Sequence, residues 1–372
     1  MRLGLIYHQF VPRGGLEGYL VEFSKRLVAA GHELDIATAE VSPQIEKLIP
    51  AEWHVLQTLR KPSVARLWQF NRLAAHWEQE APVDVTLGFG RTTCHDLHRA
   101  GGGCHAVYSR LLPTLKRWAL KNQLELGLER QLYAGSDTQL FVVNSSEIAK
   151  QIQAEYGTAA DRFRVIHTAV DTEQYRPADD PGLLRKQVCG PLKTDPARPV
   201  FLFVSLHHRR KGLDVLLDVW KDVDADLWIV GQPLNYRYRL MIAQRQLQDK
   251  IRTISHQSDL RLLFQSADWF IHPTLYDACA NTVLQSMASG LPGLISVHDG
   301  AIDHVTEGEN GYLLKQPRDS EAVFETIQKA LTTHRDKRLA MGTAARQRME
   351  ALTWPAHLEK WQSAIEDLDP TK

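Results

Sequence analysis

The sequence predicts an α/β protein of two domains, each built on a parallel sheet. In both halves a short apolar run leads into a polar or glycine-containing loop and then into an amphipathic helix. The chain of 372 residues has the length of two ordinary domains. A proline-rich, charged segment at residues 177–199 separates the halves and is typical of a connection. These three observations together indicate the fold class.

The composition excludes several classes of protein. At 44% hydrophobic and 24% charged residues it is that of a soluble globular chain, and no run of about 20 apolar residues predicts a membrane span. Lys+Arg and Asp+Glu are both 44, so no net field favours a nucleic-acid partner. The four cysteines are scattered and form no Cys-x-x-Cys, which argues against a zinc or disulfide framework and favours the cytoplasm.

The first half opens with a predicted strand at 2–7 and a helix at 16–30. Gly14 and Gly15 lie in the loop between them and allow a ligand to approach the backbone closely, although a tight turn without a ligand fits equally well. The loop lacks G-x-G-x-x-G, so no dinucleotide cofactor is expected. Further strands are predicted at 33–39, 83–89, 139–145 and 164–171, with helices at 64–80 and from residue 147.

Residues 94–105, CHDLHRAGGGCH, form the most titratable stretch of this half. A histidine such as His105 has the chemistry of a general base near neutral pH. The competing interpretation is a solvated loop or strand end.

Residues 106–134 combine apolar and cationic side chains around Trp118. Such a segment can lie on an anionic membrane surface. A helix packed on the domain with solvated lysines and arginines remains the alternative.

The second half opens with a predicted strand at 200–206, followed by a loop containing Arg210 and Lys211 and an amphipathic helix. Two adjacent cations directly after a buried strand suit a diphosphate. Further strands are predicted at 225–231, 252–256, 269–271 and 293–297, and helices at 236–247, 258–265, 319–333, 335–351 and 355–367.

Residues 271–290 carry the most informative pattern. A buried strand leads into a loop with Asp277, then into a helix with Gln285, and Gly290 occupies the expected C-cap. The unpaired N–H groups at the start of such a helix attract anions, including a nucleotide diphosphate. Asp277 and Gln285 can therefore face the same ligand.

The spacing of Asp277 and Gln285 resembles the carboxylate-x7-carboxylate signature of the family 4 retaining glycosyltransferases, which have the GT-B fold. PRGGLEGYL, RAGGGCH and the Arg210–Lys211 pair also match, so the resemblance covers most of the chain. It implies two Rossmann-like domains facing a cleft, with the C-terminal helix crossing back to the first domain. The expected divisions are 1–176 for acceptor binding, 177–353 for nucleotide-sugar binding and 354–372 for the final helix.

The resemblance also implies roles for individual residues. Arg210 and Lys211 hold the donor diphosphate without a metal ion, Asp277 lies near the transferred sugar, and Gln285 takes the ribose with a neutral amide where the family has a carboxylate. The usual acidic position near the acceptor falls on Gly102, so His105 or Asp96 is expected to substitute. The donor site as a whole is expected to comprise Gly14, Gly15, Arg210, Lys211, His256, Asp277, Asn281, Thr282, Val283 and Gln285.

The implied function is transfer of a hexose, from UDP-glucose, to a lipopolysaccharide core or a related lipid-linked glycan. Residues 106–130 are expected to touch the inner membrane from its cytoplasmic side. No cofactor is implied. The alternatives are a non-catalytic sugar-nucleotide or glycan-binding protein, and an epimerase or phosphorylase of the same fold.

Overall fold

The computed structural model describes residues 1–11, 15–59, 61–255, 257 and 259–368. It divides into two compact units, Met1–His167 with Pro355–Lys372, and Thr168–Trp354. The sequence prediction places the first division after residue 176. The structure places it at His167, and β7 (Phe163–Val165) is shorter than the strand expected at 164–171, because the chain from Thr168 onward packs within the second unit.

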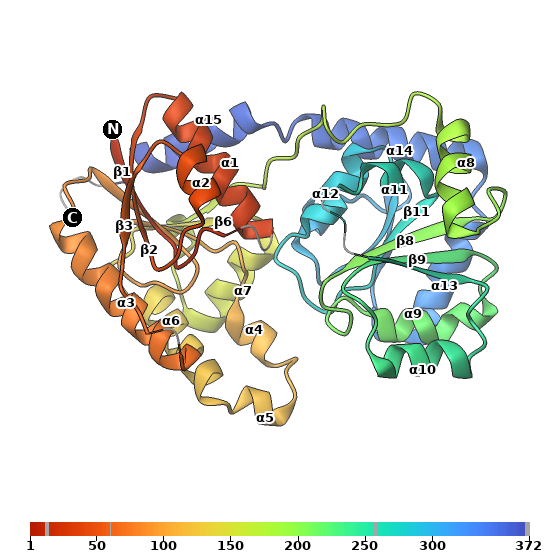
Figure 1. Ribbon diagram of the computed structural model, residues 1–372, viewed down its shortest axis with the longest axis horizontal. Coiled ribbons are helices and arrows are strands. Elements are labelled where there is room, and N and C mark those ends of the chain that lie inside the picture. The colour runs from red at the N-terminus through yellow and green to blue at the C-terminus, as the bar shows by residue number, and fades with distance from the viewer. Residues whose placement is uncertain (12–14, 60, 256, 258, 369–372) are drawn as a thin grey trace. The chain divides into compact units, whose positions relative to one another are not determined.

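The first unit is built on a seven-stranded parallel sheet in the order β3-β2-β1-β4-β5-β6-β7 (Figure 1). Its strands are β1 (Arg2–Ile6), β2 (Glu33–Thr38), β3 (Glu52–Val55), β4 (Val85–Phe89), β5 (Leu97–Arg99), β6 (Leu140–Val143) and β7. Five of these strands, β1, β2, β4, β5 and β6, are buried along almost their whole length, as expected for a sheet covered on both faces.

Helices cover both faces of this sheet (Figure 1). They are α1 (Gly15–Ala29), α2 (Pro43–Leu48), α3 (Ser63–Glu80), α4 (His105–Ser109), α5 (Thr114–Arg117), α6 (Leu120–Ala134) and α7 (Ser146–Tyr156), with η1 (Ala160–Arg162) before β7. α15 (Trp354–Glu366) belongs to the same unit, where Trp361 is fully buried with its ring 4.8 Å from that of Phe23. The last helix of the chain thus completes the core of the first unit.

The second unit has a six-stranded parallel sheet in the order β10-β9-β8-β11-β12-β13. The strands are β8 (Val200–Ser205), β9 (Asp226–Gly231), β10 (Ile251–Ser255), β11 (Trp269–His272), β12 (Gly293–Ser296) and β13 (Gly311–Leu314). The order reverses between β8 and β11, which pair through Phe201 and Leu202. In doubly wound sheets, ligands bind beyond the carboxyl ends of the strands at such a reversal.

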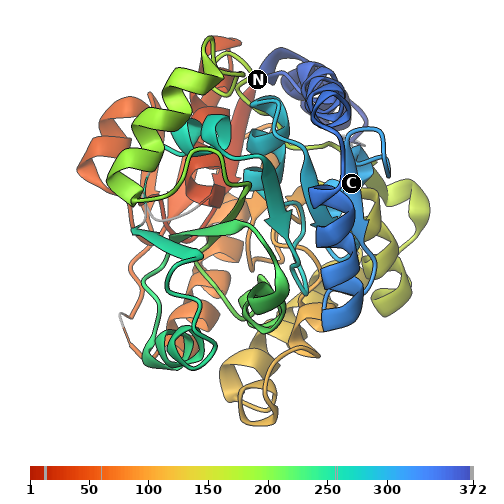
Figure 2. The ribbon, with the colours of Figure 1, turned by 90° about the vertical axis from the view of Figure 1, so that its right-hand side faces the viewer.

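The helices of the second unit also lie on both sides of its sheet (Figures 1 and 2). They are α8 (Pro181–Leu192), α9 (Leu213–Val219), α10 (Tyr236–Gln244), α11 (Arg261–Ser266), α12 (Asn281–Ala288), α13 (Ser320–Leu331) and α14 (Arg335–Glu350), with η2 (Trp220–Asp222) and η3 (Gly300–His304). One apolar core joins α9 and α13 to the sheet, and another joins α11, α12 and α14 to it.

The prediction of two parallel α/β domains is confirmed. Two strands of the first unit were missed, β3 and β5, because EWHV and LHR are short and too polar to look like buried strands. The interpretation of residues 94–105 as a solvated loop is wrong, since His95, His98 and His105 are all buried. No helix in the described part of the chain is long and apolar enough to cross a membrane.

Candidate functional site

The carboxyl ends of β8 and β11 bring together a buried group of charged and polar side chains. The loop after β8 supplies Lys211, β11 ends at His272, and the loops after β11 and β12 supply Asp277 and Asp299. We call these four residues the lysine cluster. It lies at the reversal of strand order, where the fold itself favours ligand binding.

The two loops from β8 and β11 are held in close contact by backbone bonds. The carbonyl of Arg210 accepts from the N–H of Leu275 at 2.8 Å and from Oγ1 of Thr274 at 3.2 Å. Gly212 has a φ of +85°, and a Cβ at this position would lie 2.1 Å from the carbonyl oxygen of Pro273. Only glycine fits here, so this residue sets the approach of the loop that carries Lys211 to the loop that carries Asp277.

Lys211 lies at the centre of its cluster. Its ammonium donates to the Asp277 carboxylate, and its Nζ lies 3.1 Å from Nε2 of His272. A guanidinium nitrogen of Arg210 lies 3.9 Å from Asp277. The side chain of Lys211 is only 11% exposed, so these contacts are weakly screened by water.

Electrostatics fix the charges in the lysine cluster. Burial alone would raise the pKa of Asp277, but Lys211 and Arg210, with a smaller effect of His272, hold it at about 2. Burial and the neighbouring lysine lower the pKa of His272, so its ring is neutral at neutral pH. Asp277 is therefore an ionised acceptor, beside two cations that can stabilise an anion.

The histidine and the two carboxylates could also suit a divalent cation, since their ligand atoms lie within 4.8 Å of one another. Lys211, however, already contacts two of the three side chains. The ammonium of Lys211 thus supplies one positive charge to these side chains.

The start of α12 lies directly after the Asp277 loop. Asn281, Thr282 and Val283 form its first turn, with Val283 buried in the core and the other two half-buried. Gln285 follows on the next turn and is half-buried. An amide both donates and accepts hydrogen bonds, so Gln285 has the chemistry to bind a hydroxyl group near this helix end.

The remaining donor-site residues of the prediction fall elsewhere. Gly15 is the exposed first residue of α1 in the first unit. Gly14 and His256 lie outside the described residues. The structure therefore brings together Arg210, Lys211 and Asp277, and places Asn281, Thr282, Val283 and Gln285 on the adjoining helix.

His105 is buried in a network of the first unit, and both of its ring nitrogens have partners. Nδ1 lies 3.0 Å from a guanidinium nitrogen of Arg91, and Nε2 lies 2.9 Å from Oδ1 of Asn122 and 3.1 Å from Glu125. Burial and the Arg91 charge lower the pKa of His105. The ring therefore connects α4 to α6 and to the loop after β4, rather than standing ready beside a substrate.

Asp96 is not brought to the ligand-binding edge. Its carboxylate accepts from the backbone N–H of Thr86 at 2.8 Å and from the Thr86 hydroxyl at 2.9 Å, just before β5 begins. It therefore lies toward the amino ends of the strands. Gly102, the position of the expected acidic residue, has open space around a hypothetical Cβ, so no neighbour prevents a side chain there.

His272 and Asp299 were missed by the sequence analysis. Each follows the general pattern of a polar residue at or just after the end of a parallel strand, β11 and β12 respectively. That signal was available, but Asp303 lies in the same loop segment and nothing in the sequence separates the two aspartates.

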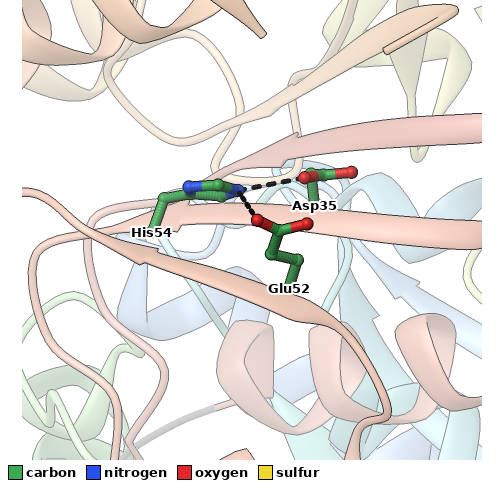
Figure 3. Close-up of side chains that lie close together, drawn as sticks. All are labelled: Asp35, Glu52 and His54. Atoms are coloured by element: carbon green, nitrogen blue, oxygen red, sulfur yellow. Dashed lines mark hydrogen bonds and ion pairs between the residues drawn. The ribbon is translucent and has the colours of Figure 1, made fainter. Parts of the chain in front are cut away.

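A second cluster of similar composition lies in the first unit, toward the amino ends of its strands. Asp35, Glu52 and His54 point toward one another from β2 and β3 (Figure 3). Arg2 lies 2.5 Å from Asp35 and 2.8 Å from Glu52. We call these four residues the arginine cluster.

Comparisons with known proteins agree with this geometry. Residues 13–174 match the family model "Glycosyltransferase Family 4", and residues 190–348 match "Glycosyl transferases group 1". The chain belongs to the family 4 glycosyltransferases. The two matched stretches cover most of both units, so the assignment does not depend on one motif.

Among curated relatives, the lipopolysaccharide glucosyltransferase WaaG of Escherichia coli (strain K12) is 22% identical over 347 residues, covering 89% of this chain and 90% of WaaG. A crystal structure of WaaG superimposes with a TM-score of 0.81 at 19% identity, covering 97% of this chain and 98% of the other. The Anabaena protein HepE, solved in complex with UDP-glucose, has a TM-score of 0.73 at 15% identity, with 98% of each chain covered. The GT-B fold is thereby confirmed.

Proposed function

We propose that this glycosyltransferase moves a hexose, from UDP-glucose, to a lipopolysaccharide core or related lipid-linked glycan, with retention and without a metal ion. The observation that carries the proposal is the buried contact of Lys211 with Asp277, next to Arg210, at the reversal of strand order. A cationic pair beside an ionised carboxylate suits a substrate with a diphosphate at one end and hydroxyl groups at the other.

In the proposed reaction, Lys211 and Arg210 stabilise the negative charge that builds up on the departing diphosphate. Asp277 accepts a hydrogen bond from a sugar hydroxyl, and Gln285 bonds the ribose. The N–H groups of Asn281 and Thr282 at the start of α12 add to the anion site, next to Val283, whose own N–H donates to the carbonyl of Ala280 at 2.9 Å. Gly14, Gly15 and His256 complete the proposed donor site, on the strength of the family resemblance.

The acceptor hydroxyl attacks on the face of the sugar that the leaving group departs from. Its proton passes to an oxygen of the diphosphate, because the ring of His105 is already engaged by Arg91 and Asn122. In this proposal His105 orders the acceptor side of the first unit and is not itself the base.

The relatives support the choice of donor and acceptor. WaaG is named for glucosyl transfer to lipopolysaccharide, and HepE was solved with UDP and with UDP-glucose. Both resemble this chain over nearly their whole length. The proposed place of action is therefore the cytoplasmic side of the inner membrane.

A protruding apolar and cationic surface supports the membrane contact. Leu115 is 90% exposed, Trp118 71% and Leu120 72%, and Lys116, Arg117 and Lys121 flank them on α5 and α6. Exposed apolar side chains flanked by lysine and arginine can bind at the interface of an anionic bilayer. We propose that this surface keeps the enzyme near a lipid-linked acceptor.

The test of the reaction is a panel of UDP-, GDP- and ADP-sugars, assayed with and without a heptose-bearing lipid acceptor in EDTA. We expect acceptor-dependent release of UDP from UDP-glucose, with the α-anomeric linkage of the donor retained in the product. A donor that binds without any turnover would instead support the non-catalytic sugar-nucleotide-binding or glycan-binding alternative, which Gln285 and Gly102 motivate because the family has acidic residues at both positions.

The test of the membrane contact is flotation with vesicles of neutral or anionic phospholipid. The wild type should float with anionic vesicles and be released by salt, whereas Trp118→Ala should float less. Trp68→Ala is the matched control, since Trp68 is 54% exposed on α3, outside the protruding surface. Equal flotation of the two variants would contradict the assignment of this surface.

A further inference from the structure

Asp299 is a fully buried carboxylate in the lysine cluster whose two oxygens have different surroundings. Its Oδ1 accepts from the backbone N–H of Ala280 at 3.1 Å and of Ala301 at 2.8 Å. These bonds tie the loop before α12 to the start of η3. Oδ1 therefore has a structural role, as the acceptor of these two bonds.

The other oxygen has no backbone donor. Oδ2 of Asp299 lies 3.1 Å from Nε2 of His272, and the same nitrogen lies 3.1 Å from Nζ of Lys211. A single ring nitrogen thus lies between a buried carboxylate and a buried ammonium. Nε2 accepts from Lys211 when the ring proton is on Nδ1. Among the described residues Oδ2 of Asp299 has no hydrogen-bond donor, and this ring nitrogen is its neighbour at ion-pair distance. The Asp299 carboxylate therefore reaches Lys211 only through the ring of His272 among the described residues.

The need for this second carboxylate follows from the proposed reaction, on which the inference rests. Asp277 would have two tasks, since it contacts Lys211 in the free protein and a sugar hydroxyl in the donor complex. When Asp277 turns to the sugar, the buried ammonium loses part of its compensation. A buried carboxylate that never contacts the sugar can supply it.

We propose that Asp299, acting through His272, is the positioning residue for Lys211 and its permanent counter-charge. Asp299 keeps the ammonium directed at the leaving diphosphate while Asp277 binds the sugar. His272 is the spacer that fixes the direction, because its ring is fully buried and stacks on Phe270 with an interplanar angle of 14°.

Asp299→Asn separates this role from the structural one. Asparagine keeps an oxygen for the N–H groups of Ala280 and Ala301, but it replaces the charged Oδ2 by an amide nitrogen that donates toward His272. We expect kcat to fall about tenfold, the usual size of a coupling between contacting groups. We expect the KM for the donor to fall, because removing a negative charge from the site favours binding of a diphosphate. A general loss of structure would instead raise KM.

A double-mutant cycle decides whether Asp299 acts through the lysine. The four proteins are the wild type, Asp299→Asn, Lys211→Ala and the double variant, each assayed for turnover and for UDP affinity by calorimetry. Asp299→Asn should change both quantities in the wild type and neither in the Lys211→Ala background. His272→Asn, introduced in the same two backgrounds, should behave in the same way and serves if Asp299→Asn does not fold.

The matched control is Asp226→Asn. Asp226 is an equally buried aspartate of the same sheet, but it begins β9 and faces Arg198 at the amino ends of the strands. Its effect should be equal in both backgrounds. An effect of Asp299→Asn that is also equal in both backgrounds overturns the inference. Failure of the wild type to transfer any sugar overturns the proposed function instead, and the UDP-affinity cycle then still tests the link between Asp299 and Lys211.

Discussion

The lysine cluster of the second unit and the arginine cluster of the first have almost the same composition. Each combines a histidine, two carboxylates and a long cationic side chain. They differ in their place on the sheet, since one lies at the carboxyl ends of the strands and the other toward the amino ends. They also differ in burial, because Glu52 is 62% exposed, whereas the lysine cluster has no member as open to water.

This difference indicates that the position of such a cluster on the sheet, more than its residue types, determines its role. Parallel sheets present loops and helix N-termini at the carboxyl ends of their strands, so a buried charge there can meet a ligand. At the amino ends the same groups pair with one another. We therefore propose that the lysine cluster serves binding and catalysis and that the arginine cluster serves stability.

The largest expected effect follows from Lys211→Ala. Loss of the buried ammonium should lower kcat/KM by about a hundredfold, as expected for a group that stabilises a developing anion. Lys221→Ala is the matched control, because Lys221 is 62% exposed on η2 of the same unit. Steady-state kinetics with UDP-glucose and acceptor check the prediction, and undiminished turnover of Lys211→Ala would remove the basis for the proposed mechanism.

A smaller effect is expected at Gln285. Gln285→Glu should tighten UDP binding by about tenfold, because a carboxylate forms stronger hydrogen bonds to hydroxyl groups than a neutral amide does. Gln285→Ala should weaken binding. Calorimetric titration with UDP measures both changes, and a Gln285→Glu variant that binds UDP more weakly than the wild type would show that the amide does not face the ribose.

A substitution in the arginine cluster should lower the stability of the protein and leave its activity unchanged. Asp35→Asn removes the negative charge of a part-buried ion pair and should lower the free energy of unfolding by about 1–2 kcal/mol. Turnover and UDP affinity should remain those of the wild type. Urea unfolding followed by circular dichroism gives the first quantity. A loss of activity larger than the loss of folded protein would mean that this cluster also serves the reaction.

The difference in unfolding free energy between the wild type and Asp35→Asn should depend on pH in a defined direction. The hydrogen bond from Arg2, assisted by His54, lowers the pKa of Asp35 below its usual value of 3.8. A carboxylate with a depressed folded pKa stabilises the protein above its unfolded pKa and loses this effect as the pH falls through the folded pKa. The stability gap between wild type and Asp35→Asn should therefore be full at pH 7 and shrink below pH 3.8. A gap that persists undiminished at pH 2.5 would exclude this ion pair as its cause.

Much of the fold and part of the site could be predicted from the sequence. The alternation of apolar runs and amphipathic helices indicated both sheets. The family resemblance assigned Lys211 and Asp277 to one donor site, and each lies in a loop that follows a buried strand. The strands β3 and β5 could not be recognised, since strands of four and three residues are defined by their pairing with neighbours and not by their own composition.

The contacts of individual side chains were beyond the sequence. Asp299 and Asp303 look alike in DGAIDHV, and only the fold turns Asp299 inward to accept from Ala280 and Ala301. His105 has the chemistry of a base, but its partners lie on α6 and in the loop after β4, where spacing along the chain gives no indication of contact. Residue type predicts what a group can do, whereas its neighbours decide what it does.

Because α15 packs in the first unit, the chain passes between the two units twice. The second unit is one continuous stretch, Thr168–Trp354, whereas the first is made of two. The second is thus inserted into the first, and two peptide crossings join them. A protease that cuts either crossing divides the chain into two fragments, and the packing of α15 on the first unit then holds them together without a covalent bond. The inserted stretch, with a whole sheet and two apolar cores of its own, is the part to express alone.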